Sequence, residues 1–178
     1  MSGTEATVGA RVIDRQAEVD RVWSVLETVT DPEIPVLTVV DLGVAREVRL
    51  GDDGRVEVVI TPTYSGCPAK TMIELGIVAA LEAAGYPDPR VTTVLAPPWT
   101  TDWLSEAGRR KLEEYGIAPP AQATASKRAL LFGPGDEVRC LRCRSANTER
   151  VSEFGSTACK ALYRCRDCLE PFDYFKCI

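Results

Sequence analysis

Four cysteines near the C-terminus stand in two C-x-x-C pairs, CLRC at 140–143 and CRDC at 165–168. One C-x-x-C turn offers two sulfur atoms from a single tight bend, and tetrahedral Zn²⁺ needs four such soft donors. A connecting β-hairpin, with strands at 147–154 and 159–165, would make a zinc ribbon. The spacing therefore predicts a structural Zn²⁺ site; an iron–sulfur cluster in the same thiolates is the alternative. The four ligands are Cys140, Cys143, Cys165 and Cys168.

A separate cysteine, Cys67, lies in TPTYSGCPAK, between a strand-like run and a helix-like run. We predict that the helix begins at Pro68 and that Cys67 caps it, where the helix dipole favours a thiolate. Asp31 and Glu33 could add carboxylate ligands and form a transient site for iron or an iron–sulfur cluster, provided that the fold joins the two loops. In the alternative, Cys67 is an inert cap and the two acids are turn residues. The spare Cys159 and Cys177 are interpreted as inward-pointing strand residues.

The composition excludes several classes of function. The chain contains no histidine, so a Ser-His or Cys-His nucleophile pair and a histidine-ligated metal are excluded. No catalytic residue is assigned, and we expect a protein that is not an enzyme. The net charge of −5 argues against nucleic-acid or membrane binding. A nucleic-acid-binding ribbon is a weak alternative, because acidic residues interleave with its arginines. Without a signal peptide or a long apolar run, we expect a soluble, cytoplasmic protein.

The remaining patterns predict an α/β fold. A helix is expected after Asp14, followed by a hairpin of strands 44–50 and 55–60 around GDDG. A second helix to Ala84, a strand at 88–95 and a helix at 101–115 complete an α-β-β-α-β-α sandwich, followed by the β zinc ribbon. The expected organisation is a disordered N-terminus at 1–13, a sandwich domain at 14–115, a linker at 116–135 and the ribbon at 136–178.

Several motifs resemble known families. DPEIPVLTVVDLG, TPTYSGCPA and APPWTTDW resemble the domain of SufT-type iron–sulfur assembly factors and their eukaryotic cytosolic counterparts. TPTYSGCPA, WTTDWLSEAGRRKLEEYGIAPP and SEFGSTACKALYRCRDCLEPFDYFKC are similar to the PaaD (also called PaaJ) family of small subunits encoded with the phenylacetyl-CoA ring epoxidase. The second resemblance runs from about residue 16 to the end of the chain.

The resemblance implies an accessory protein of aerobic phenylacetate catabolism. It would assist insertion of iron or an iron–sulfur cluster into the reductase or oxygenase subunit, with those subunits and the iron–sulfur assembly machinery as partners. Cys67 would be the cysteine of the assembly domain, and Asp31 and Glu33 would belong to its acidic motif. The alternative is a scaffold that docks the epoxidase components through the ribbon.

The first knuckle departs from the pattern of that family, in which proline follows the first cysteine and glycine the second. Here these positions are Leu141 and Arg144. At a positive φ, arginine costs roughly 1 kcal/mol more than glycine.

Overall fold

The computed structural model describes residues 5–120 and 138–176, with side chains described from residue 15 onward. The first part of the chain contains α1 (Glu5–Leu26), β1 (Ala45–Leu50), β2 (Val56–Ile60), α2 (Lys70–Ala83), β3 (Arg90–Thr93), the 3₁₀ turn η1 (Thr101–Trp103), α3 (Glu106–Tyr115) and β4 (Ile117–Ala118). The second part contains β5 (Thr148–Ser152), β6 (Lys160–Cys165) and β7 (Pro171–Phe175). No helix among the described residues is both long enough and apolar enough to cross a bilayer.

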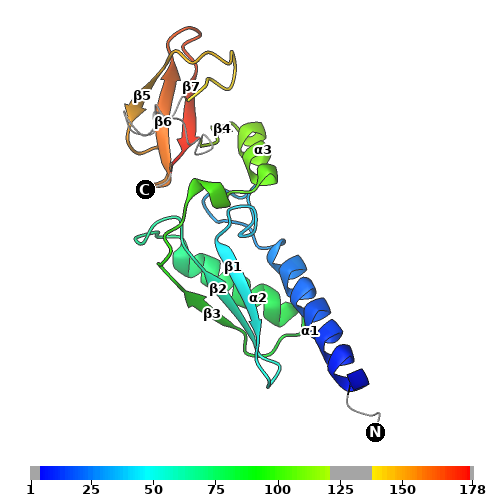
Figure 1. The fold of residues 1–178 in the computed structure, drawn as a ribbon. Helices are drawn as coiled ribbons and strands as arrows, with labels where there is room; N and C mark the ends of the chain where they lie inside the picture. The colour runs from blue at the N-terminus through cyan, green and yellow to red at the C-terminus, as the bar shows by residue number, and fades with distance from the viewer. Residues whose placement is uncertain (1–4, 121–137, 177–178) are drawn as a thin grey trace.

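The first sheet has the strand order β1-β2-β3, and two helices pack on it (Figure 1). β1 and β2 form the antiparallel hairpin that GDDG predicts, and α2 is the crossover that lets β3 lie parallel to β2. Apolar residues of α1 and α2 recur at helical spacing and meet the alternating apolar face of β2, which produces one core. Its fully buried members include Val22, Leu26, Ile77, Leu81, Val58 and Ile60.

Three predicted helix starts differ from the structure. The helix expected at 101–115 begins at Glu106, after the 3₁₀ turn η1. α1 begins at Glu5, so residues 5–13 are helical rather than disordered, and Asp14 lies inside the helix instead of capping it. α2 begins at Lys70 with Ala69 at its N-cap, so the cap lies two residues beyond Cys67. The predicted end of this helix is confirmed, because Gly85 follows it with a φ of 93°.

The second sheet has the order β4-β7-β6-β5. The predicted hairpin is present as β5 and β6, and the sequence reasoning missed β7 and β4. β4 falls within the predicted linker and pairs in parallel with β7. The linker is therefore wrong for Ile117 and Ala118, which belong to the ribbon's sheet. Residues 121–137 lie outside the described part of the chain.

The ribbon and the sandwich share one apolar core. Ile117, Cys159 and Phe175 are buried in the same cluster as the residues of α1, α2 and β2. The ring of Phe175 meets the ring of Trp99 edge to face, with 6.0 Å between centroids. The indole N–H of Trp99 in turn donates to the carbonyl of Leu42 at 2.9 Å. These contacts hold the ribbon against the loops at one end of the sandwich (Figure 1).

The DLG segment at 41–43 contacts α3 and holds it at the end of the sandwich that faces the ribbon. Gly43 has a φ of 64°, and a Cβ there would approach the backbone oxygen of Trp103 to 2.3 Å, so only glycine fits. The Asp41 carboxylate accepts hydrogen bonds from Ser105, the N-cap of α3, and from Lys111 within that helix. The loop and the helix that leads into β4 therefore form one unit.

Candidate metal centres

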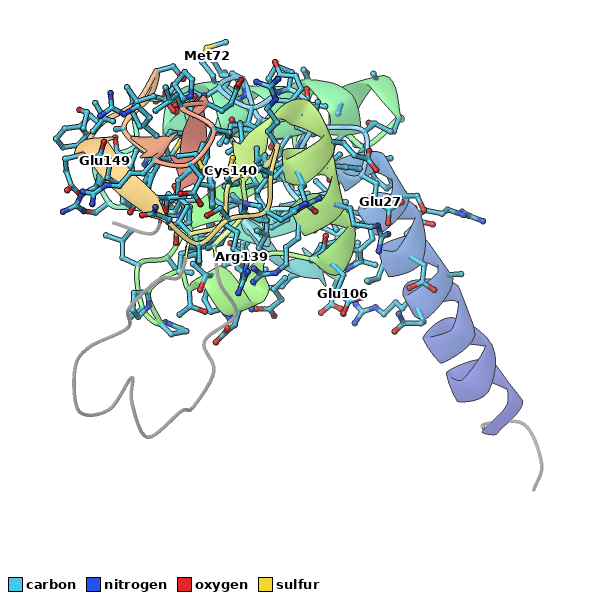
Figure 2. The ribbon with its side chains drawn as sticks, turned by 90° about the horizontal axis from the view of Figure 1, so that it is seen from above. Glu27, Met72, Glu106, Arg139, Cys140 and Glu149 are labelled. Carbon is cyan, nitrogen blue, oxygen red and sulfur yellow. The ribbon has the colours of Figure 1, made fainter. Side chains whose placement is uncertain are left out.

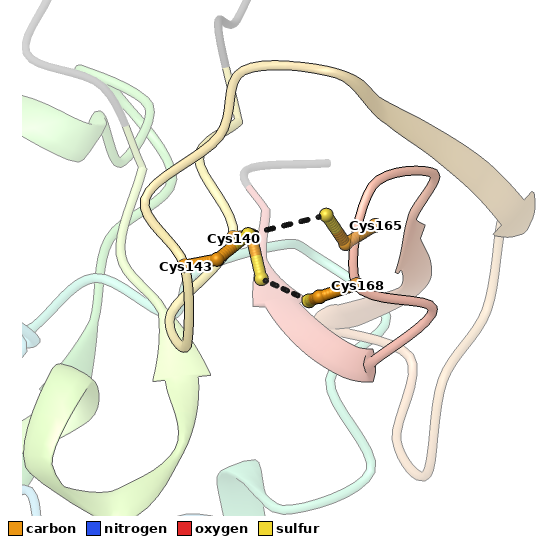
Figure 3. A group of neighbouring side chains, drawn as sticks. All are labelled: Cys140, Cys143, Cys165 and Cys168. Atoms are coloured by element: carbon orange, nitrogen blue, oxygen red, sulfur yellow. Dashed lines mark hydrogen bonds between the residues drawn. The ribbon is translucent and has the colours of Figure 1, made fainter.

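The four cysteines of the two C-x-x-C pairs converge on one point (Figure 3). Cys140 Sγ lies 3.6 Å from Cys168 Sγ, and Cys143 Sγ lies 3.5 Å from Cys165 Sγ. All four sulfur atoms lie within 4.8 Å of one another. A Zn–S bond of about 2.3 Å in tetrahedral geometry requires sulfur atoms roughly 3.8 Å apart. The donor set therefore fits a tetrahedral metal ion such as zinc.

The thiols of this group influence one another's pKa values. Burial raises the pKa of Cys140, but the N–H groups of Cys143 and Arg142 outweigh burial and lower this pKa to about 7. The N–H of Ser145 lowers the pKa of Cys143, yet burial and sharing of hydrogen bonds with the other thiols raise it to about 12. Four thiolates this close repel one another, so they ionise together only around a positive ion.

The arginines near the knuckles are paired with carboxylates. Arg164 and Arg166 both bind Glu149, and Arg142 binds Glu170 at 3.0 Å. Pairing removes much of the positive potential that phosphate groups would seek. This arrangement disfavours the interpretation of the ribbon as a nucleic-acid-binding module.

Each knuckle ends in a residue with left-handed backbone geometry. Arg144, directly after Cys143, has a φ of 61°, and Leu169, directly after Cys168, has a φ of 63°. Arg144 thus adopts the left-handed geometry that glycine usually provides at this position. The arginine has a use that glycine would lack, because its guanidinium forms an ion pair with Glu113 of α3.

We predict that glycine at these two positions has different effects. Left-handed geometry costs an L-residue about 1–2 kcal/mol, and glycine avoids this cost. Glycine also makes the unfolded chain more flexible, which lowers the stability of the folded protein by about 0.5–1 kcal/mol. Leu169→Gly should therefore stabilise the metal-loaded protein by up to about 1 kcal/mol in urea denaturation. Arg144→Gly should be nearly neutral, because it also loses an exposed ion pair worth up to about 1 kcal/mol. Equal stabilisation by both variants would show that the Glu113 ion pair contributes nothing.

The second candidate centre begins with the acidic loop. Asp31 is buried, and its Oδ1 accepts hydrogen bonds from the N–H groups of Glu33 and Ile34, both at 2.8 Å. Burial raises the pKa of Asp31, and the charge of Glu33 adds to the rise, whereas the two N–H groups and the charge of Lys160 lower it. One oxygen of Asp31 thus shapes the turn that presents Glu33, which is half-buried.

The structure brings Cys67 into electrostatic range of both acids. Burial raises the pKa of the Cys67 thiol, and the charges of Glu33 and Asp31 raise it further. The N–H groups of Ala69 and Lys70 lower the pKa but do not prevail. The expectation of a thiolate favoured by the helix end is therefore wrong. Cys67 precedes the cap, and the neighbouring carboxylates favour its neutral form in the absence of a cation.

The structure places a second cysteine next to Glu33, one that the sequence indicated only as an inward-pointing residue. Cys159, from the ribbon, is buried with its Sγ 3.5 Å from Oε2 of Glu33 and 3.1 Å from Oγ1 of Thr157. Burial raises the pKa of Cys159 to about 11, and the charges of Glu33 and Asp31 contribute to the rise. The sequence gives no local pattern that could predict this contact, because 126 positions separate Cys159 from Glu33 in the chain. Cys177 lies outside the described residues.

The fold defines a class of protein with two parts. An α/β domain with one isolated cysteine is followed by a ribbon with four clustered cysteines. Two family models match these parts. The iron–sulfur cluster assembly protein family matches residues 19–96, and the PaaD zinc beta ribbon domain matches residues 124–176. The chain belongs to the PaaD family.

Comparison with individual proteins supports this assignment. A protein of Escherichia coli, named provisionally as a subunit of 1,2-phenylacetyl-CoA epoxidase, is 49% identical over 90% of this chain and 94% of its own length. An Fe-S protein maturation auxiliary factor of Porphyromonas gingivalis is 38% identical over 49% of this chain and 83% of its own length. A crystal structure of a domain of unknown function, DUF59, from Bacillus anthracis covers 55% of this chain and 92% of its own, with a TM-score of 0.51 and 25% identity.

Proposed function

We propose that this protein is an accessory maturation factor of a phenylacetyl-CoA epoxidase system. It holds iron or an iron–sulfur cluster at Cys67, with carboxylates of Glu33 and Asp31 as further ligands. It passes this cargo to the reductase or oxygenase subunit. The observation that carries the proposal is a half-buried cysteine within electrostatic range of two carboxylates, in the domain that matches the iron–sulfur cluster assembly family.

The chemistry of the site suits a temporary metal ligand better than catalysis. A nucleophilic cysteine needs a neighbouring base or cation that lowers its pKa. The groups near Cys67 are carboxylates, which raise its pKa. A cation such as Fe²⁺ reverses this effect, because it offsets the carboxylate charge and displaces the thiol proton. The same groups that make the thiol a poor nucleophile therefore make it a site for a metal cargo.

We predict that Cys67→Ala lowers the iron content of the client subunit without unfolding this protein. The variant would be co-expressed with the epoxidase oxygenase and reductase, and metal would be measured in each purified component. The ribbon should keep its own metal, because Cys67 lies outside the four-cysteine group. Clients with full iron and full activity beside Cys67→Ala would overturn the proposal.

The acidic loop allows a sharper comparison. Asp31→Asn keeps an oxygen acceptor for the N–H groups of Glu33 and Ile34, whereas Asp31→Ala loses it. If Asp31 ligates the cargo, Asn and Ala should both lower client iron. If only Ala lowers client iron, Asp31 shapes the loop and is not itself a ligand.

A second candidate function is a scaffold that docks the epoxidase subunits. The ribbon exposes Val151 and Phe154, at 55% and 59%, and α2 exposes Met72, at 59%, which points outward at the edge of the molecule in Figure 2. Contact with another protein would remove these apolar side chains from water. The scaffold requires a stoichiometric complex that forms equally well with Cys67→Ala and clients that carry full iron.

A further inference from the structure

We propose that Cys159 is the second thiolate ligand of the cargo site, so that the site is completed only where the ribbon meets the assembly domain. Cys67 and Glu33 come from the assembly domain, and Cys159 comes from the ribbon. The inference rests on the proposed function, and it assigns the ribbon a direct role in holding thiolate-ligated iron.

The surroundings of Cys159 differ from those of an inert buried cysteine. A structural cysteine packs as a small apolar group among other apolar side chains. Here the sulfur faces a carboxylate oxygen at 3.5 Å and a hydroxyl oxygen at 3.1 Å. Cys159 thus reaches into the core from the ribbon and meets polar groups at its tip.

Glu33 is the residue that links the two cysteines of the proposed site. The Cys159 thiol donates directly to this carboxylate, and the charge of the carboxylate acts on Cys67. Burial raises the pKa of Tyr64, three residues before Cys67, and the charges of Cys67, Glu33 and Cys159 raise it further. Cys159 therefore contacts the Glu33 carboxylate directly, and Cys67, from a distant part of the chain, lies within electrostatic range of the same carboxylate.

The balance of charge also favours a cation at this place. Asp31 is 8% exposed and Cys159 is 6% exposed, and Glu33 is half-buried beside them. Ionised groups of one sign are costly when water is largely excluded, and a bound cation offsets that cost. Lys160, also buried, supplies one positive charge close to Asp31. A metal bound by the two thiols would release one proton from each to solvent and replace those protons as the positive partner of Glu33.

The ligand atoms of the proposed cargo site are not already gathered around one point, which suits a metal that must be released. Within residues 15–120 and 138–176, the four-cysteine ribbon site is the one group whose three or more ligand atoms are already gathered for a metal. Such a closed set of four thiolates retains its ion. A site assembled from two domains gathers its ligands when iron binds and gives them up when the client takes the iron.

The test is a titration of the full-length, zinc-loaded protein with Co²⁺, which gives near-ultraviolet charge-transfer absorption for each thiolate bound. Zinc content is measured before and after the titration to establish that the ribbon site is unchanged. The variants are Cys67→Ser, Cys159→Ser and Glu33→Gln, with Cys177→Ser as the control for removal of a thiol. We expect wild type and Cys177→Ser to show the absorption of two thiolates. Cys159→Ser should show one, with affinity weakened about tenfold or more.

The outcomes separate this inference from the proposed function. If Cys67→Ser lowers the absorption and Cys159→Ser leaves both absorption and affinity unchanged, the role of Cys159 is overturned and the proposed function stands. If wild type binds no Co²⁺, or Cys67→Ser binds it as wild type does, both fail. A parallel anaerobic titration with Fe²⁺ alone, and with Fe²⁺ plus sulfide, distinguishes an iron ion from an iron–sulfur cluster as the cargo.

Discussion

Cys165→Ala is expected to abolish metal binding in the ribbon and to unfold it. Cys165 is fully buried at the end of β6 and is one of four sulfur ligands. A module of about 40 residues buries too little apolar surface to fold alone, so the metal must stabilise it. Structural zinc contributes about 10–16 kcal/mol of binding free energy in zinc-finger peptides, which exceeds the whole stability of many domains. Far-ultraviolet circular dichroism, limited proteolysis and metal analysis measure the loss.

The matched control is Cys67→Ser, which removes a thiol that lies outside the four-cysteine group. It should keep one metal per chain and a protease-resistant ribbon. Metal analysis of the same wild-type sample also distinguishes zinc from an iron–sulfur cluster in these four cysteines. A folded, protease-resistant ribbon in metal-free Cys165→Ala would contradict the prediction.

Local patterns in the sequence predicted most of the fold. The GDDG turn, the apolar spacing of α2 and the glycine after its end are signals that span a few residues, and each matches the structure. The knuckle cysteines belong to the same class, because a C-x-x-C turn fixes its own geometry.

Long-range pairing could not be read from the sequence. β4 has only two residues, and its pairing with β7 places Ile117 opposite Asp173, far along the chain. The contact of Cys159 with Glu33 joins the two domains in the same way. Neither contact can be predicted from the periodicity of apolar residues, because this periodicity indicates which face of an element is buried and not which residues cover that face.

The expectation that failed at the candidate site was the lowered pKa of Cys67. A cysteine before a helix is expected to have a lowered pKa, and two N–H groups do act in that direction on Cys67. Burial is the largest effect and raises the pKa of Cys67 instead, and the charges of Glu33 and Asp31, from a loop more than 30 positions earlier, raise it further. The environment thus disfavours a free thiolate and favours a thiol that ionises when a cation binds.

Phe175→Ala is expected to uncouple the two domains, which makes it the strongest test of the shared core. The substitution removes a ring that is 1% exposed and packs against Trp99 of the sandwich. Truncation of a buried phenylalanine costs about 3–5 kcal/mol. Because Phe175 lies in the core common to both domains, we expect one cooperative urea transition in wild type and two in the variant.

Phe172→Ala is the matched control, since it removes an equally large ring from the same strand. β7 alternates its faces, so Phe172 packs instead in the ribbon's own cluster, stacked on Tyr163 at 6.1 Å. Its loss should destabilise the ribbon and leave the sandwich transition where it is. Only Phe175→Ala should separate Cys159 from Glu33, and it should therefore weaken Co²⁺ binding at the cargo site while the ribbon keeps its own metal. If both variants weaken Co²⁺ binding equally, the domain interface has no special part in that site.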